Sequence, residues 1–147
     1  MMRLLLITTG IFLATTEPAW LHDITTAKEK ARKEHKFILL NFSGSDWCLP
    51  CIRLHKELFD TEAFTGFANE NLVLVNADFP RKNKNQPTKE QQKINDAMAE
   101  RYDPNGNFPY TLLLDADGNK VKVWDGFYKN GVESFIEEIK NAEATAR

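Results

Sequence analysis

The sequence has no excess of charge of either sign, no internal repeats and little cysteine. Its 19 lysines and arginines, against 21 aspartates and glutamates, give a formal net charge of −2. That balance excludes a general nucleic-acid binder, which needs a strongly basic surface. The absence of repeats, low-complexity tracts and a linker predicts one domain, and 147 residues are enough to bury a core. After residue 19 no stretch is apolar enough to span a bilayer, so we expect a soluble mature protein.

The two cysteines, Cys48 and Cys51, limit the sites that the chain can build. With the nearby His55 they supply three metal ligands at most, and a tetrahedral zinc site usually needs one more. We therefore expect neither a metal site nor a cofactor. His55 is interpreted as an ordinary, partly exposed helix histidine, and a role in tuning Cys51 is the alternative.

The N-terminal segment resembles a secretory signal. A cationic start at Arg3 precedes an apolar stretch over residues 4–14, which is too short for a membrane span. We expect residues 1–19 to be a signal peptide cut after Ala19, and residues 20–147 to form one exported domain, periplasmic or secreted, in a bacterium. Glu17 is unusual three positions before such a cut, so an earlier cut or a retained anchor stays open.

Hydrophobic periodicity predicts alternating strands and helices. Amphipathic or capped patterns predict helices over residues 23–36, 49–59, 60–67 and 88–102 and near the C-terminus, with Ala97 among the inward residues of the fourth. Apolar runs predict strands over residues 37–42, 72–78 and 110–115. Asp117-Gly118 predicts a hairpin into an alternating strand that begins at Lys120. This order indicates an α/β fold, a central mixed sheet flanked by helices on both faces.

Both cysteines lie where the first apolar strand passes into a helix. Cys48 is placed at the helix start, where unpaired backbone N–H groups and the helix dipole favour its thiolate. Cys51 shares a face with Leu54 and Leu58, which predicts that it points to the core. We therefore expect Cys48 to be the exposed, attacking sulfur and Cys51 the shielded sulfur that resolves the mixed disulfide.

The motif Trp47-Cys48-Leu49-Pro50-Cys51, in this order of elements, resembles the thioredoxin family. The approach Phe-x-Gly-Ser-Asp-Trp-Cys over residues 42–48 is similar to that of exported bacterial thioredoxin-like proteins. The resemblance implies a thioredoxin-like fold and a thiol–disulfide oxidoreductase. It further implies a cis-proline at Pro109, with the Phe108 backbone pairing with an extended substrate segment. Trp47 either offers a flat apolar surface to substrate or simply packs on the helix.

One position departs from the family pattern. The buried acid that serves the inner cysteine in thioredoxins falls here on Asn41, and an amide cannot act as a base. The usual partner lysine is expected to be replaced by Leu74.

Asp46 is interpreted as a helix cap. A group of basic residues is interpreted as a solvated loop; its members are Arg81, Lys82, Lys84 and Lys89.

The leading hypothesis is an exported reductase of protein disulfides that cycles Cys48 and Cys51 between dithiol and disulfide. Its partners would be protein disulfide substrates and a membrane or extracytoplasmic thiol electron donor, with no nucleic acid, and nothing in the sequence demands more than a monomer. Two alternatives stay open. One is a module that carries soft metal such as copper on the two thiolates, and the other is a non-catalytic adaptor with a locked disulfide.

Overall fold

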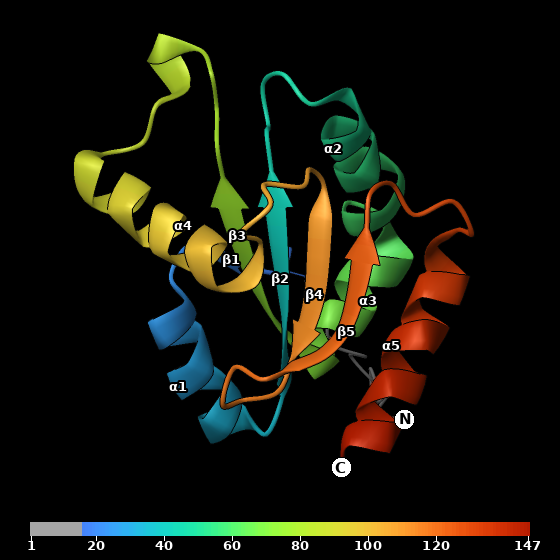
Figure 1. Ribbon diagram of the computed structural model, residues 1–147. Helices are drawn as coiled ribbons and strands as arrows, with labels where there is room; N and C mark the ends of the chain where they lie inside the picture. The colour runs from blue at the N-terminus through green and yellow to red at the C-terminus, as the bar shows by residue number, and fades with distance from the viewer. Residues whose placement is uncertain (1–15) are drawn as a thin grey trace, which may run out of the picture.

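The computed structural model describes residues 16–147 and shows five strands in one mixed sheet (Figure 1). The strands are β1 (Trp20–Leu21), β2 (Phe37–Ser43), β3 (Leu72–Asp78), β4 (Tyr110–Leu114) and β5 (Lys120–Asp125), in the spatial order β1-β3-β2-β4-β5. β3 runs parallel to both β1 and β2, whereas β4 is antiparallel to β2 and β5 to β4. The predicted mixed sheet is confirmed. The two-residue β1 was not predicted, because it is too short to show a periodicity.

Helices cover both faces of this sheet. They are α1 (Ile24–Glu34), α2 (Leu49–Leu54), α3 (Glu62–Asn71), α4 (Lys89–Tyr102) and α5 (Val132–Ala146), with a π-helical turn η1 (His55–Phe59) after α2 and a short 3-10 turn η2 (Asn83–Asn85). The helix predicted over residues 49–59 is therefore present, but its second half is π-helical. The helix predicted to end at residue 67 continues to Asn71.

Side-chain alternation along the strands divides the core into two halves. On β2, Leu39 packs with residues of α2, α3 and α5, whereas Ile38 and Leu40 pack with residues of α1 and α4. Because successive side chains of a strand alternate between the two faces, the side chain of Asn41 points to the same face of the sheet as that of Leu39. The sequence thus directs one polar side chain of the central strand toward α2, the helix that carries the cysteines.

Helix α4 illustrates one prediction that is confirmed and one that is wrong. Thr88 caps this helix through its hydroxyl, which accepts from the backbone N–H of Gln91, as predicted. Ala97 was expected to face inward but is exposed. Asn95 is buried instead, because its amide donates to the backbone carbonyl of Asp78 at the end of β3. The buried side of α4 therefore combines the apolar side chains of Met98 and Tyr102 with one hydrogen-bonded amide.

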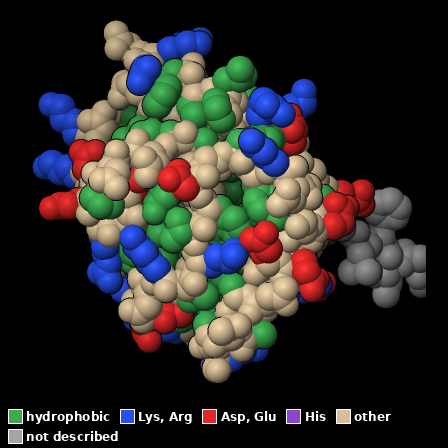
Figure 2. Space-filling view, turned by 45° about the vertical axis from the view of Figure 1, so that its right-hand side comes forward, with side chains coloured by type: hydrophobic (Ala, Val, Ile, Leu, Met, Phe, Trp, Pro, Cys, Tyr) green, Lys and Arg blue, Asp and Glu red, His purple; other side chains and the backbone are tan. Residues whose placement is uncertain are grey.

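The surface carries charges of both signs. Figure 2 shows basic and acidic side chains interspersed across the face it presents, with apolar side chains between them. Within residues 16–147, no helix has the length and apolar character needed to cross a membrane. The signal peptide predicted over residues 1–19 falls mostly on residues 1–15, which lie outside the described part, and it stays a prediction.

Candidate active site

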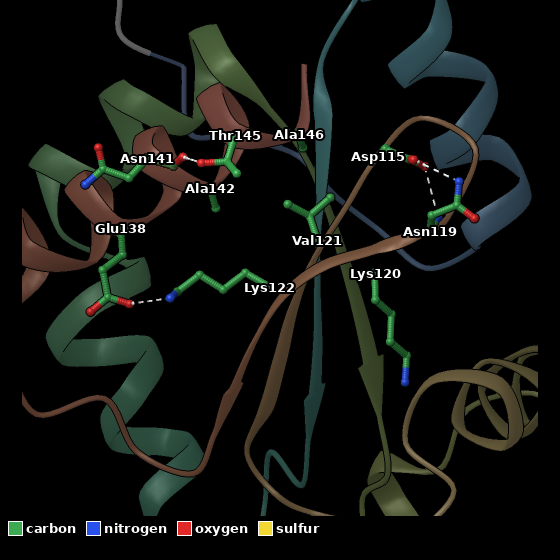
Figure 3. Close-up of a pocket in the computed structure, with 10 residues that line it drawn as sticks. All are labelled: Asp115, Asn119, Lys120, Val121, Lys122, Glu138, Asn141, Ala142, Thr145 and Ala146. Carbon is green, nitrogen blue, oxygen red and sulfur yellow. Dashed lines mark hydrogen bonds and ion pairs between the residues drawn. The ribbon is translucent and has the colours of Figure 1, made fainter.

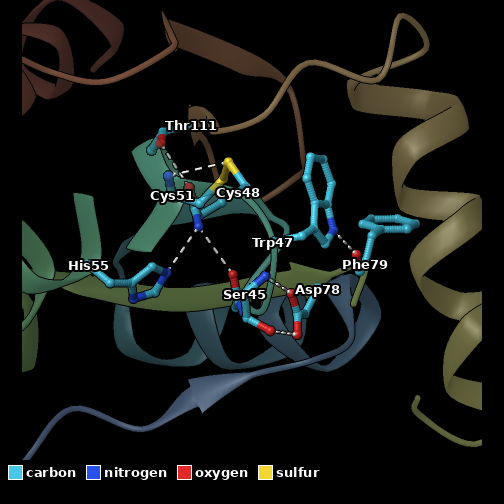
Figure 4. The surroundings of a disulfide bond; sticks show 10 residues. Ser45, Trp47, Cys48, Cys51, His55, Asp78, Phe79 and Thr111 are labelled. Carbon is cyan, nitrogen blue, oxygen red and sulfur yellow. Dashed lines mark hydrogen bonds between the residues drawn. A yellow bond between two sulfur atoms is a disulfide. The ribbon is translucent and has the colours of Figure 1, made fainter. Parts of the chain in front are cut away.

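The cysteine pair sits at the end of the central strand, where a tight turn leads into α2 (Figure 4). The carbonyl of Gly44 accepts from the backbone N–H of Cys48 at 2.9 Å, which closes the turn. A Cβ atom at Gly44 would overlap the indole ring of Trp47, so only glycine fits this close approach. The turn therefore delivers Cys48 to the N-cap position of α2.

Cys48 and Cys51 form a disulfide, with an S–S distance of 2.13 Å and Cα atoms 5.2 Å apart. Cys51 is fully buried, as predicted. The exposure predicted for Cys48 is wrong for this state, because its side chain is only 5% exposed. Its sulfur turns back over the first turn of α2, where it bonds Cys51 and accepts from the Cys51 backbone N–H at 3.3 Å. Cys48 is nonetheless the member of the pair that reaches solvent.

Two exposed apolar side chains neighbour the disulfide on α2. Leu49 is 67% exposed and Ile52 is 44% exposed, and both are among the few large apolar side chains exposed in residues 16–147. They follow Cys48 and Cys51 directly in the sequence. The surface around the redox pair is therefore partly apolar, although α2 is otherwise anchored in the core by Leu54.

Trp47 is half-buried and held from several sides. Its indole N–H donates to the carbonyl of Phe79 at 2.8 Å, and the Phe108 ring meets it edge-on with centroids 5.6 Å apart. The guanidinium of Arg81 lies 3.6 Å from the centroid of the indole ring. These contacts come from Phe108 and from the chain after β3, so packing of Trp47 on the helix and its contact with substrate both stay predictions.

The Phe108–Pro109 peptide bond is cis, as the resemblance implies. Pro109 is buried and directly precedes β4, whose first residue, Tyr110, pairs with Phe42 of β2. The Phe108 ring also packs against Phe79. The sheet register and these ring contacts bring Phe108 and Pro109 beside Trp47, which precedes the redox pair. The predicted site residues therefore lie together at one end of the sheet.

Asp46 does not cap α2, and that expectation is wrong. Its carboxylate accepts from the backbone N–H groups of Arg81 and Lys82 and from the side-chain amide of Asn85, all in the basic loop after β3. These hydrogen bonds, the largest from Arg81, hold the pKa of Asp46 below its usual range. Cys48 occupies the cap position instead. Asp46 thus ties the basic loop to the turn that carries the cysteines.

A buried polar cluster lies on the face of the sheet below α2. Asn41 is fully buried, and its Oδ1 accepts from the hydroxyl of Thr111 at 3.0 Å. Its amide nitrogen lies 3.2 Å from Oδ1 of Asn76 and 3.3 Å from Nε2 of His55. The register pairs Asn41 with Asn76, and Leu74 pairs with Leu39. Leu74 was expected in the place of the partner lysine. That expectation is wrong, because the residue opposite Asn41 is Asn76, two positions further along the same face of β3.

His55 begins the π-helical turn and is half-buried. Its ring packs against Trp20 of β1 and against Phe59, with centroids 5.5 Å and 5.1 Å away. Burial lowers the pKa of His55 below its usual range, and the charges of Asp60 and Asp78 offset only part of that effect. The predicted partial exposure of His55 is confirmed, but its interpretation as an ordinary helix histidine missed this cluster. A signal was available, because Asn41, Asn76 and Thr111 each interrupt an apolar strand.

Two hollows of the described part differ in their relation to the cysteines. A pocket of about 420 Å³ is lined by Cys51, His55 and Asn76 among others. A larger one of about 660 Å³ lies between β5 and α5, where Lys122 pairs with Glu138 at 3.2 Å (Figure 3). Its lining includes Lys120, which pairs with Leu114. Leu114 ends β4, whereas Pro109 precedes its start, so this larger pocket extends to the end of β4 away from the cysteine pair. Within residues 16–147, no group of three or more metal-binding side chains is present.

Comparison with known proteins agrees with this geometry. Residues 24–142 match the family described as a thioredoxin-like domain. The chain is 35% identical to the disulfide bond reductase DsbH of Chlamydia pneumoniae over 116 residues. This aligned region spans 79% of this chain and 68% of that protein. A solved structure of a DsbH oxidoreductase matches at a TM-score of 0.79 and 30% identity, over 96% of this chain and 94% of that one. The C-terminal domain of Neisseria meningitidis DsbD, in the oxidised form, shares the fold at a TM-score of 0.56 and 20% identity, over 80% and 90% of the two chains. The chain therefore belongs to the thioredoxin-like family and is a thiol–disulfide oxidoreductase.

Proposed function

We propose that this protein is an exported reductase of protein disulfides. The thiolate of Cys48 attacks a substrate disulfide, which releases one substrate thiolate and forms a mixed disulfide. Cys51 then attacks the Cys48 sulfur and releases the second substrate thiol, so that the substrate gains two electrons and the Cys48–Cys51 disulfide forms. The observation that carries the proposal is the disulfide at the start of α2, of which only the Cys48 end reaches solvent.

The direction of electron transfer is supported by two observations. The relative from Chlamydia pneumoniae is named a disulfide bond reductase. Pro50, the second residue between the cysteines, matches the reducing thioredoxin type. Family potentials range from about −270 mV for reducing members to about −120 mV for oxidising ones, so we expect a value nearer the lower limit. Equilibration with glutathione checks this direction, and a value near the upper limit would contradict it.

The substrate surface is proposed to consist of Trp47, Phe108 and Pro109. An extended substrate segment would pair with the backbone at Phe108, as a strand added to the sheet, and would rest on the half-buried indole. The exposed side chains of Leu49 and Ile52 extend this surface with apolar area that a partner can cover. A partner with an unfolded or extended segment around its disulfide fits these features.

The N-terminal pattern supports the proposed location, and that location requires an electron donor outside the cytoplasm. A cationic start followed by a short apolar stretch supports export, so we propose a periplasmic or secreted monomer. A reductase outside the cytoplasm needs a supply of electrons, and a membrane or extracytoplasmic thiol protein is proposed as the donor. Fractionation of cells that express the full chain tests the location, and recovery in the cytoplasm would contradict it.

Trapping tests the roles of the two cysteines. A Cys51→Ser variant lacks the resolving thiol, so we expect it to retain substrate proteins as mixed disulfides through Cys48. The Cys48→Ser variant is the matched control and should retain none. Adducts through Cys51, or equal adducts on both variants, would contradict the assignment. Insulin reduction by wild type, and its loss in Cys48→Ser, separates turnover from stoichiometric thiol chemistry.

A further inference from the structure

We propose that His55 accepts the proton of Cys51 in the resolving step. It would thus have the role that a buried carboxyl group has in thioredoxins, although it stands at a different position in the chain. The inference rests on the proposed role of Cys51 as the resolving cysteine. It assigns a proton-accepting function to a side chain outside the Cys-x-x-Cys motif, and the polar cluster around Asn41 positions that side chain.

The placement of His55 is the first argument. His55 follows Cys51 by one helical turn, and its backbone N–H donates to the Cys51 carbonyl. Cys51 is closed to bulk solvent, yet it lines the pocket of about 420 Å³ together with His55 (Figure 4). Cys51 and His55 therefore share one pocket, which is large enough for the water that would carry a proton between them.

The hydrogen-bond pattern is the second argument, because it favours one form of the ring. The carbonyl oxygen of Asn41 is engaged by the Thr111 hydroxyl, so its amide nitrogen donates to Asn76 Oδ1 and to His55 Nε2. A ring nitrogen that receives an N–H carries a lone pair and no proton. With the amide in this orientation, Nε2 is the basic nitrogen of a neutral imidazole, and the Asn41 N–H must release it when Nε2 takes a proton. Asn41 itself cannot take a proton.

The surroundings of the ring are the third argument. The groups that face it with charge are Asp60 at the end of η1, Asp78 at the end of β3 and Lys56 in the pocket lining, whereas Trp20 and Phe59 cover it with apolar rings. Burial keeps the resting imidazole neutral, and the two carboxylates favour the imidazolium that forms when it accepts a proton. The imidazole therefore carries no proton near neutral pH and is free to accept one.

The Cys51 thiol gives its proton to His55, through a pocket water, and becomes a thiolate. The thiolate attacks the Cys48 sulfur of the mixed disulfide, so one S–S bond forms and the bond from Cys48 to the substrate breaks. The substrate leaves as a thiolate, with the electron pair of the broken bond. His55 then returns its proton to solvent or to that thiolate.

A single turnover with 5,5′-dithiobis-(2-nitrobenzoate) separates the two sulfurs. Reduced protein and one equivalent of reagent release a first thionitrobenzoate when Cys48 attacks, and a second when Cys51 displaces the mixed disulfide. The variants are His55→Phe, which keeps an aromatic ring, and His55→Gln, which keeps a polar group for Asn41. His35→Asn is the control, since His35 is exposed and ends α1 in a left-handed conformation that asparagine tolerates.

Both His55 variants should slow the second release by about tenfold or more near pH 6.5, since general bases contribute roughly 10²–10⁴-fold. The deficit should shrink as the pH rises to and above about 8.5, the usual value for a free cysteine, because thiols then ionise with less need of a base. The first release, and both releases of His35→Asn, should match wild type. A wild-type second release in His55→Gln, or slowing by the same factor at every pH, would overturn the proposal. If Cys48 were not the attacking cysteine, the Cys48→Ser variant would still show the first release. That result differs from failure of the His55 proposal, which concerns only the second release.

Discussion

Replacement of Asn41 by leucine tests the buried polar cluster that supports the active site. Leucine keeps the branching of the side chain but removes its three hydrogen bonds. The Thr111 hydroxyl is only 1% exposed, so its unpaired state costs about 1–3 kcal/mol. Asn76 and His55 line the pocket, where water replaces the lost partner, so each contributes about 0.5–1.5 kcal/mol. We expect the free energy of unfolding to fall by about 2–6 kcal/mol in total.

Urea unfolding of the oxidised proteins at pH 7 measures this loss, with Thr111→Val as the matched variant. Thr111→Val alone leaves the Asn41 oxygen unpaired and should cost about 1–2 kcal/mol. The double variant Asn41→Leu/Thr111→Val has no orphaned hydroxyl, so its loss should be smaller than the sum of the two single losses by about 1–2 kcal/mol. A loss below about 0.5 kcal/mol for Asn41→Leu, or strict additivity, would refute the account of the cluster.

Three further predictions concern single side chains. Asn41→Asp places a carboxyl group near Cys51 and should change the pH dependence of insulin reduction; an unchanged profile would remove position 41 from proton transfer. Burial raises the pKa of Glu143, and its Oε1 has no partner in the described part. The unfolded chain therefore ionises this group at lower pH than the folded protein, and the carboxylate destabilises the fold at neutral pH. Glu143→Gln should raise the free energy of unfolding by about 1 kcal/mol at pH 7, with no gain below about pH 4 in urea titrations; an equal gain at both pH values would exclude the ionisation. Asp46→Ala should speed amide exchange at Arg81 and change Trp47 fluorescence, whereas unchanged exchange would show that the loop holds without Asp46.

Most of the fold was predictable because the strands are apolar runs separated by clear helix and turn signals. The run that forms β2 is buried along its whole length, and the Cys-x-x-Cys pair follows it at the strand-to-helix turn. The cysteine site was predictable for the same reason, since both partners lie within one motif. The π-helical form of η1 was not, because an i to i+5 hydrogen bond such as that from Asp60 to His55 has no sequence signature.

The polar cluster was missed because it joins residues that are distant in sequence. Asn76 and Leu74 lie on the same face of β3, and only the register of β2 on β3 decides which of them meets Asn41. That register is a property of the folded sheet. The exposure of Cys48 was misjudged for a related reason, because the disulfide and the first turn of α2 draw its sulfur inward.

In the reduced protein we expect one sulfur to be acidified and reachable at the start of α2 while its partner stays shielded. Alkylation of the reduced protein by iodoacetamide, followed by mass spectrometry across pH, measures both properties at once. The account predicts that Cys48 is modified first, with a titration midpoint below the value of about 8.5 for free cysteine, and that Cys51 stays unmodified. Equal modification of both residues, or a midpoint for Cys48 at or above that value, would contradict it.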